Sequence, residues 1–319
     1  MIGRMQTQLD CLPCYLRQAL DAARQVTDDE EVQWAVLRRV CHTLQLVDVR
    51  RPPPAMAQHI HRIIRAVLGE DPYRKLKERM NRLGVALRER LRPQVAGAPD
   101  PFAAAVRVAI AANCIDFGAR RNITPRSVTR QLEAAFDLPL HGSVAALRRA
   151  AGRARHILYL ADNAGEIALD RLLIEQLPPG AVTVAVRGRP VINDATLDDA
   201  EEAGLAGWAK LIANGSDAPG TLLADCTPAF REAFVQADLI VAKGQGNYES
   251  LAGTRGRPIY FLLIPKCPLV ARHVGAPEDT LVVRAAAHRR RATLAEPPGG
   301  RGGEARIRPA SPGVAPPRR

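Results

Sequence analysis

Hydrophobic and polar positions follow two different patterns along this chain. Up to about residue 150, apolar residues recur at the three- and four-residue spacing of amphipathic helices. Farther along, short apolar runs alternate with helical stretches, which predicts a largely parallel sheet covered by helices on both faces. The runs that indicate strands are His156–Ala161, Val182–Val186, Lys210–Ala213, Asp238–Ala242, Ile259–Ile264 and Thr280–Val283.

The first half of the chain is expected to form a series of helices. One helix covers Cys11 to Arg24, and another follows a capping box at Thr27–Glu30. The stretch from Pro93 to Pro101 is rich in Pro, Gly and Ala, which predicts a loop. A very apolar, buried helix is expected from Phe102 to Phe117.

These patterns predict the fold class α/β: an α/β/α sandwich with a mostly parallel, Rossmann-like sheet, preceded by a helical N-terminal domain. The helical domain would occupy residues 1–150 and the α/β domain residues 151–284. Residues 285–319 are low in apolar residues and rich in Pro, Gly and Arg, a composition typical of a disordered tail.

The formal net charge of +12 is concentrated at the end of the chain. After residue 288 there are eight Arg and two Glu, so this tail carries +6 of the total. We therefore do not infer nucleic-acid binding from charge alone. No apolar run approaches the length of a membrane helix, and Met1–Gln8 has no hydrophobic signal region. A cytoplasmic protein with no membrane partner is expected.

Polar residues follow the first two predicted strands at the point where each ends. Asp162 and Asn163 follow the first, and Asn193 and Asp194 follow the second. Asp and Asn also favour turns and helix N-caps, so one such pair would be ambiguous. Two adjacent parallel strands, however, would bring both pairs to one edge, where ligands of α/β sheets bind. Asp162, Asn163 and Asp194 could share a hard cation there.

Later strands are followed by residues suited to an anion. Lys243-Gly244-Gln245-Gly246 has small residues that let backbone N–H groups approach a phosphate, and Lys266 offers a positive charge. No P-loop motif, no G-x-G-x-x-G after the first strand and no G-x-S-x-G occurs, so the better-known nucleotide and hydrolase folds do not fit.

Two further motifs keep alternative interpretations. Asn113 and Asp116 share one face of an apolar helix, either as structural hydrogen-bonding groups or as groups that face the cleft. Cys11 and Cys14 form a C-x-x-C pair with no second pair to complete a zinc site and no preceding strand. Packing, metal binding and redox chemistry all remain open for it.

Together these motifs resemble the damage-control phosphatases, a metal-dependent family formerly catalogued as a domain of unknown function. The chain is most similar to the prokaryotic branch with the N-terminal cysteine pair, over residues 9–284. The resemblance is carried, in chain order, by Cys11-x-x-Cys14, Asn113-x-x-Asp116, Asp162-Asn163-Ala164-Gly165-Glu166, Asn193-Asp194-Ala195-Thr196, Lys243-Gly244-Gln245-Gly246-Asn247-Tyr248-Glu249 and Lys266-Cys267-Pro268.

The resemblance implies a helical portion packed on an α/β/α sandwich. It also implies a divalent metal at Asp162, Asn163 and Asp194, with Lys266 holding phosphate. Mn, Mg, Ni or Co are the metals considered, and carboxylate and amide ligands suit Mg²⁺ or Mn²⁺. Arg189 and the Arg-rich tail depart from the family pattern.

The predicted function is a metal-dependent phosphatase acting on small phosphorylated metabolites, such as sugar phosphates or damaged phosphometabolites. Asp162, Asp194 and Lys266 are the predicted catalytic residues. The predicted substrate-binding residues are Asn113, Asp116, Lys243, Gly244, Gly246, Asn247 and Glu249. The alternatives are a Rossmann-like methyltransferase that uses S-adenosylmethionine, and a nucleic-acid-binding protein acting through the basic tail.

Overall fold

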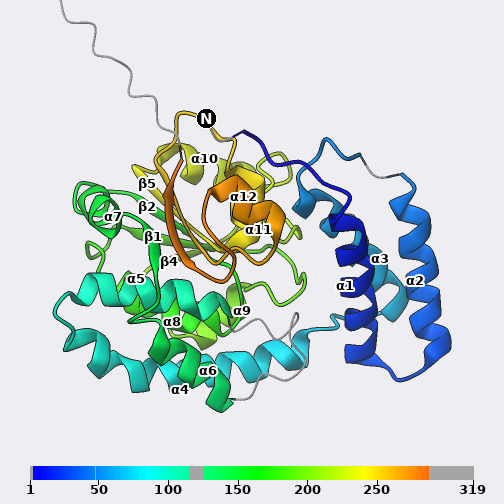
Figure 1. Cartoon of the computed structure of the whole chain (residues 1–319), viewed down its shortest axis with the longest axis horizontal. Coiled ribbons are helices and arrows are strands. Elements are labelled where there is room, and N and C mark those ends of the chain that lie inside the picture. Colours follow the sequence, from blue (N-terminus) through cyan, green and yellow to red (C-terminus); the bar gives the residue numbers. More distant parts are fainter. Residues whose placement is uncertain (1–2, 47, 115–124, 287–319) are drawn as a thin grey trace, which may run out of the picture. The chain divides into compact units, whose positions relative to one another are not determined.

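A seven-stranded sheet organises the fold, with the strand order β1-β7-β6-β5-β2-β3-β4 (Figure 1). The computed structural model describes residues 3–46, 48–114 and 125–286. Neighbouring strands are parallel except for the β6–β7 pair, which confirms the predicted α/β class with a mostly parallel sheet. The strands are β1 Leu140–Gly142, β2 Ile157–Leu160, β3 Val182–Val186, β4 Lys210–Ala213, β5 Leu239–Lys243, β6 Ile259–Leu263 and β7 Leu281–Ala285.

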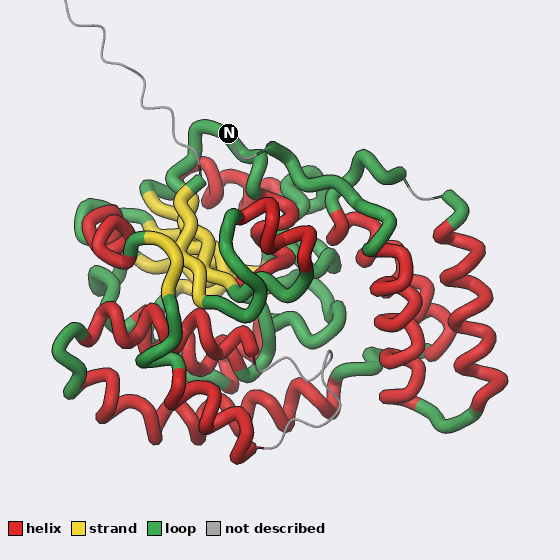
Figure 2. The backbone as a smooth tube through the Cα atoms, viewed as in Figure 1, coloured by secondary structure: helices red, strands yellow, loops and turns green. Residues whose placement is uncertain are grey.

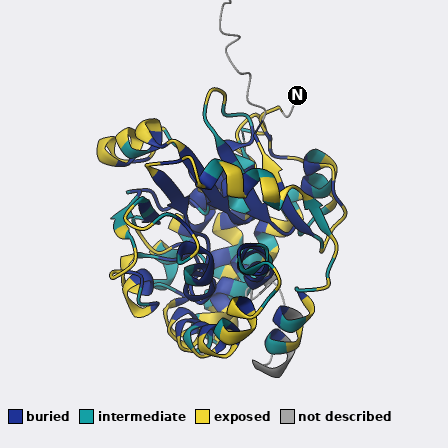
Figure 3. Cartoon of the chain, turned by 90° about the vertical axis from the view of Figure 1, so that its left-hand side faces the viewer, coloured by how far each residue is buried: buried dark blue, intermediate teal, exposed yellow. Residues whose placement is uncertain are grey.

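Helices cover both faces of this sheet (Figure 2). The central strands are apolar on both faces: in β2, Tyr159 packs into one core cluster and Leu158 and Leu160 into the other. One face is covered by α4 Arg74–Ala96, α5 Pro101–Ala111, α6 Pro125–Ala134, α7 Val144–Ala151, α8 Glu166–Ile174 and α9 Leu197–Glu202. The other is covered by α10 Pro228–Gln236, α11 Gly244–Leu251 and α12 Pro268–Val274. Figure 3 shows the strands buried between these layers.

The first three helices, α1 Cys11–Val26, α2 Glu30–Leu44 and α3 Pro53–Leu68, pack on one another. Asp29 caps α2 by accepting the N–H of Glu31 at 2.9 Å. Helix α3 also contacts α11, and the apolar core that contains these helices continues to the sheet. The described residues 3–286 all belong to one compact unit. The expected division into two domains at residue 150 stays a prediction.

One local prediction was wrong, and one strand was missed. The expected loop from Pro93 begins instead as the last turn of α4, because Leu91 and Val95 are buried and this packing outweighs the hydrogen bond that Pro93 loses. Strand β1 was not predicted, since it has three residues and no apolar alternation and forms only by pairing with β7. The helix expected from Phe102 ends as α5 at Ala111 and a 3₁₀ turn to Cys114; residues 115–124 lie outside the described part.

Within the described ranges, no helix combines the length and the apolar character needed to cross a membrane.

A close backbone contact places the start of α8. A Cβ atom added to Gly84 of α4 would lie 2.2 Å from the carbonyl oxygen of Gly165, and Gly165 itself has a φ of +76°. The N–H of Gly165 donates to Oδ1 of Asn81, one turn earlier on α4, at 2.8 Å. Two glycines and one amide thus set the position from which Glu166 begins α8.

We expect Gly84→Ala to lower the free energy of unfolding by about 1–3 kcal/mol, because the added methyl group overlaps the Gly165 carbonyl. Helix propensity alone would change stability by about 1 kcal/mol in the opposite direction. Urea denaturation measures the difference. Gly207→Ala is the matched control, since nothing lies within 4 Å of a Cβ at that position. A stabilised Gly84→Ala protein would contradict the close contact.

An ion network joins α3 to the loop after β4. Asp217, whose side chain is 3% exposed, accepts Nε of Arg62 at 2.9 Å, Nη2 of Arg65 at 2.5 Å and Nε2 of Gln58 at 2.7 Å. Burial raises the pKa of Asp217, but the hydrogen bonds from Arg62 and Gln58 outweigh burial and lower it to about 2. The charged carboxylate therefore stabilises the attachment of α3.

Because the folded pKa of Asp217 lies below the value of about 3.9 in an unfolded chain, its contribution is present above pH 4 and is lost as the pH falls toward 2. Asp217→Asn should lower the free energy of unfolding by about 2 kcal/mol at pH 7. The difference should shrink between pH 4 and pH 3. Urea titrations at these pH values test this, with Glu232→Gln on the exposed face of α10 as the control. A pH-independent difference would argue against the ion network.

Candidate metal and phosphate site

A pocket of about 440 Å³ opens at the carboxyl ends of β2, β3, β5 and β6. Strands β2 and β5 are neighbours, with β3 and β4 on one side and β6 and β7 on the other, so the chain reverses its winding direction here. Ligands of open α/β sheets bind at such a point. The segments that follow the strands contribute Asp162, Asn163, Asn193, Asp194, Gly246, Glu249, Lys266 and Cys267 to the lining. Helices α1 and α3 contribute Cys11, Cys14, Tyr15, Arg17, Gln18 and Ala57 among others.

Backbone pairing beyond the strands brings the three predicted metal ligands together. The N–H of Ala195 donates to the carbonyl of Asp162 at 2.8 Å, and Asn163 and Asp194 form an isolated antiparallel bridge. The N–H of Ala164 donates to Asn193 at 2.8 Å. The loops after β2 and β3 are thus held as a pair, so both carboxylates and the amide line the same pocket.

The donor set fits a hard cation. Burial and the nearby charges of Glu166 and Asp194 raise the pKa of Asp162 well above its usual range, so negative charge is crowded at this point. Among the described residues, no three His, Cys, Asp or Glu side chains are placed to hold a metal ion. A cation here would therefore need the amide oxygen of Asn163 beside the two aspartates, the oxygen set that Mg²⁺ and Mn²⁺ prefer.

Arg187, at the end of β3, was missed by the sequence analysis. Its side chain is 1% exposed; Nε donates to Oδ2 of Asp194 at 2.6 Å, and Nη2 lies 3.6 Å from Oδ1 of Asp162. The same Nη2 has no hydrogen-bond partner. A charged residue directly after the buried run 182–186 was the available signal, since it stands at the same edge as Asp162.

Asn247 lies behind the pocket and does not line it. Its Oδ1 accepts Nη1 of Arg187 at 3.2 Å, and its Nδ2 donates to the carbonyls of Ala161 and Lys243 at 3.1 and 2.8 Å. These hydrogen bonds connect the ends of β2, β3 and β5. Binding of substrate by Asn247 stays a prediction that these contacts do not support.

The stretch Lys243–Gly246 is not a loop: it is the end of β5 and the first turn of α11. Gly244 has a φ of +74°, and a Cβ atom there would lie 1.8 Å from Oδ2 of Asp162. Lys243 is fully buried, and its Nζ donates to Oε1 of Glu166 at 2.6 Å and to Asp170. The ammonium group of Lys243 therefore faces away from the pocket that it was predicted to line.

Lys266 lines the pocket with Glu249 and is held by Gln245. The side-chain oxygen of Gln245 accepts the backbone N–H of Lys266 at 2.9 Å, and its Nε2 donates to Glu249 at 2.8 Å. Burial raises the pKa of Glu249 to about 7, although the bond from Gln245 lowers it. Burial is the main cause that raises the pKa of Asp162, and the positive charge of Lys266 only partly opposes this rise.

Two asparagines complete the surroundings of Asp162. Asn113 is fully buried, and its Nδ2 donates to Asp162 at 2.7 Å and to Glu166 at 3.0 Å. Asn193 lines the pocket with an Nδ2 group that has no hydrogen-bond partner, and the sequence analysis gave it no role of its own. Asp116 lies outside the described residues.

The cysteine pair also faces this pocket. Cys11 and Cys14 on α1 line it together with Cys267, which follows Lys266. Burial is the main cause that raises the pKa of each of these thiols, so all three are protonated at neutral pH. The cysteine pair therefore lies on the same pocket as Asp162 and Asp194, and its packing, metal-binding and redox roles stay predictions.

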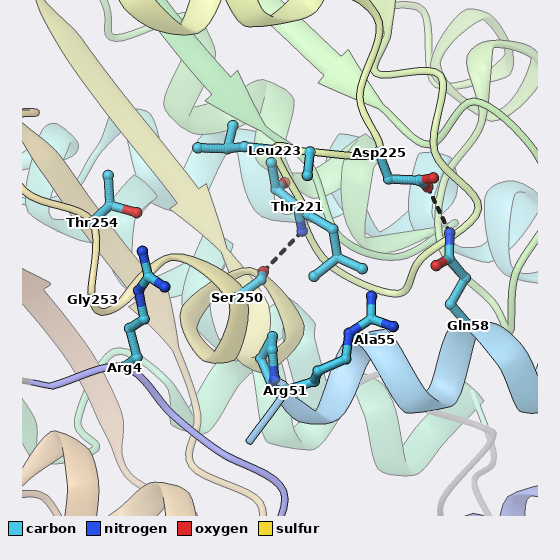
Figure 4. A pocket seen from close by; sticks show the side chains of 13 residues that line it. Arg4, Arg51, Ala55, Gln58, Thr221, Leu223, Asp225, Ser250, Gly253 and Thr254 are labelled. Carbon is cyan, nitrogen blue, oxygen red and sulfur yellow. Dashed lines mark hydrogen bonds between the residues drawn. The ribbon is translucent and has the colours of Figure 1, made fainter. Parts of the chain in front are cut away.

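A second cavity, of about 400 Å³, lies beyond the loop at 219–221 and contains none of the predicted site residues (Figure 4). Arg4, Arg51, Asp225 and Ser250 line it, and Ser250 accepts the N–H of Thr221 at 2.9 Å. Thr221 also donates its hydroxyl to Asn247 at 2.7 Å, so the lining of this cavity is bonded to the residue that lies behind the first pocket.

Comparison with known proteins identifies relatives over nearly the whole described chain. An uncharacterized protein of Methanocaldococcus jannaschii is 35% identical over 279 residues, which are 83% of this chain and 91% of that protein. A damage-control phosphatase of Archaeoglobus fulgidus is 34% identical over 285 residues, 86% of this chain and 97% of that protein. The crystal structure of a DUF89 family protein from Pyrococcus horikoshii matches with a TM-score of 0.81 and 30% identity, covering 89% of this chain and all of that one.

The family model of the damage-control phosphatase ARMT1-like domain matches residues 7–282. This range contains both the first helices and the sheet, and it confirms the resemblance that the sequence motifs indicated. The chain belongs to the ARMT1-like damage-control phosphatase family.

Proposed function

We propose that this protein is a divalent-metal-dependent phosphatase that hydrolyses phosphomonoesters of small metabolites, including sugar phosphates or damaged phosphometabolites. Family membership supports the phosphatase activity itself. The observation that carries the finer proposal is the placement of Asp162, Asn163, Asp194 and Lys266 around a single pocket.

Asp162, Asn163 and Asp194 would hold the cation, which when bound supplies positive charge beside the phosphoryl oxygens. Lys266 would bind a phosphoryl oxygen as a point charge. The unpartnered Nδ2 of Asn193 is a buried donor on the same wall, and we assign it to the same phosphoryl group.

The first turn of α11 supports this arrangement. Gly246 lines the pocket, and the N–H groups of a helix's first turn lack partners within the helix, which favours an anion at this end. Gly244 lets the chain pass against Asp162 without a side chain between them. The attacking group is water or one of the two aspartates, and either choice requires the same placement of Asp162 and Asp194.

The two alternative functions have weaker support. A methyltransferase would need a glycine-rich loop after its first strand, whereas β2 is followed by Asp162 and Asn163 paired to the next loop. Nucleic-acid binding would act through the tail at residues 285–319, of which residues 287–319 lie outside the described part, and would leave the carboxylates of the pocket without a role.

Metal-stripped protein should hydrolyse p-nitrophenyl phosphate only after Mg²⁺, Mn²⁺, Co²⁺ or Ni²⁺ is added back. Asp194→Asn should lower the metal-stimulated rate by about 100-fold or more, because it removes one of the two charged oxygens that balance the cation. Asp137→Asn removes an exposed carboxylate elsewhere and should leave the rate unchanged. Full activity in chelator, or in Asp194→Asn, would contradict the metal site.

Lys266→Met should lower kcat/KM for the same substrate by about 100-fold, because a charged donor to the phosphoryl group is lost. It should leave Mn²⁺ affinity unchanged or increase it, since a positive charge near Asp162 is removed. Steady-state kinetics and calorimetry measure the two effects. Lys210→Met, at an exposed lysine of β4, is the control. Loss of Mn²⁺ binding in Lys266→Met would show a general collapse of the pocket instead.

A further inference from the structure

Three fully buried charged side chains lie directly behind the proposed cation site. Glu166 and Asp170 are four residues apart on α8 and therefore share one face of that helix. Lys243, from the end of β5, reaches both: its Nζ donates to Oε1 of Glu166 at 2.6 Å and to Asp170. Burying these charges costs desolvation free energy even when they are paired. The stability of the fold alone therefore does not explain why they are there.

The second carboxylate oxygen of Glu166 faces the site. Its Oε2 accepts Nδ2 of Asn163 at 2.9 Å and Nδ2 of Asn113 at 3.0 Å. The same two Nδ2 groups also donate to Oδ2 of Asp162, at 3.0 and 2.7 Å. Two amides and two carboxylate oxygens thus form one closed set of hydrogen bonds.

This set decides which end of the Asn163 amide is available. The Glu166 carboxylate, which is ion-paired with Lys243, only accepts hydrogen bonds, so the NH₂ end of the amide must turn toward Glu166. The oxygen of Asn163 is left for the pocket, and oxygen is the end that a cation requires. Without the Glu166 carboxylate, only the bond to Oδ2 of Asp162 would hold the NH₂ end of this amide away from the pocket.

Lys243 keeps the Glu166 carboxylate in this orientation. By holding Oε1, it leaves Oε2 as the oxygen that receives the two amides. It is fixed on its other side by Asp170. This explains why Lys243 lies at the end of a strand near phosphate chemistry and still has no exposure to the pocket.

We propose that Glu166, held by Lys243, is a positioning residue that turns the oxygen of Asn163 toward the cation. The inference rests on the proposed function, because it concerns the same cation. It replaces the predicted substrate-binding role of Lys243 with a role in metal affinity. Partners that orient metal ligands typically change affinity by about 10- to 100-fold.

The test is Mn²⁺ binding to metal-stripped protein, measured by calorimetry and by the electron spin resonance of free Mn²⁺. In Glu166→Gln, the one remaining oxygen pairs with Lys243 and an NH₂ group then opposes the amide of Asn163. We expect Mn²⁺ affinity to fall by about 10- to 100-fold. Lys243→Met should weaken Mn²⁺ in the same way, whereas a substrate-binding lysine would raise KM and leave Mn²⁺ affinity unchanged.

The double variant Glu166→Gln with Asn163→Asp is the decisive comparison. It exchanges the amide and the carboxylate, keeps the net charge, and provides a ligand oxygen whichever way residue 163 turns. Mn²⁺ affinity should recover to within about threefold of the wild-type protein. A residue with only a structural role would not be rescued by this exchange.

Glu175→Gln is the matched control, because it removes a carboxylate at the other end of α8 that pairs with Arg92 and Arg171. Circular dichroism and thermal unfolding of the metal-free proteins identify variants that fail to fold. If Glu166→Gln alone does not fold, the Mn²⁺ affinities of Lys243→Met and of the double variant Glu166→Gln with Asn163→Asp test the positioning role. Wild-type Mn²⁺ affinity in folded Glu166→Gln and Lys243→Met would overturn the positioning role alone. Absence of Mn²⁺ binding by the wild-type protein would overturn the proposed metal function as well.

Discussion

Compensation of buried negative charge is the constraint on which the rest of this structure depends. Asp162, Glu166, Asp170 and Asp194 converge at one edge of the sheet, where burial makes each uncompensated charge expensive. Lys243 lies between two of these carboxylates, and the guanidinium of Arg187 bonds Asp194 and lies 3.6 Å from Asp162. Both basic residues come from strand ends, so the sheet itself delivers the compensating charge.

Close backbone approaches make this convergence possible. Gly84 allows α4 to touch the turn that starts α8, and Gly244 allows the end of β5 to lie against Asp162. The side chain of Asn81 then ties the turn to α4 through Gly165. Each contact tolerates no Cβ atom, which links the packing of the helical layer directly to the geometry of the acidic edge.

The pocket has a second wall of a different origin. Helix α1 supplies Cys11, Cys14 and Arg17 to the lining, and α3 supplies Ala57. Asp217 anchors α3 through three side-chain donors. The edge with Asp162 and Asp194 is held by backbone pairing of the loops after β2 and β3, whereas the opposite wall depends on the Asp217 ion network, which acid weakens.

The sequence by itself determined the sheet strands other than β1, the place of the site at their carboxyl ends, and the meeting of Asp162, Asn163 and Asp194, because strand periodicity and the winding of α/β sheets depend on local pattern. It could not separate Lys243 from Lys266, since both follow strands and both suit phosphate. Only the tertiary structure directed Lys243 inward to Glu166 and Asp170 and placed Arg187 between two aspartates. The direction of a charged side chain at a strand end depends on the opposite charges packed against it. For Lys243 these are Glu166 and Asp170 of α8, which are distant in sequence.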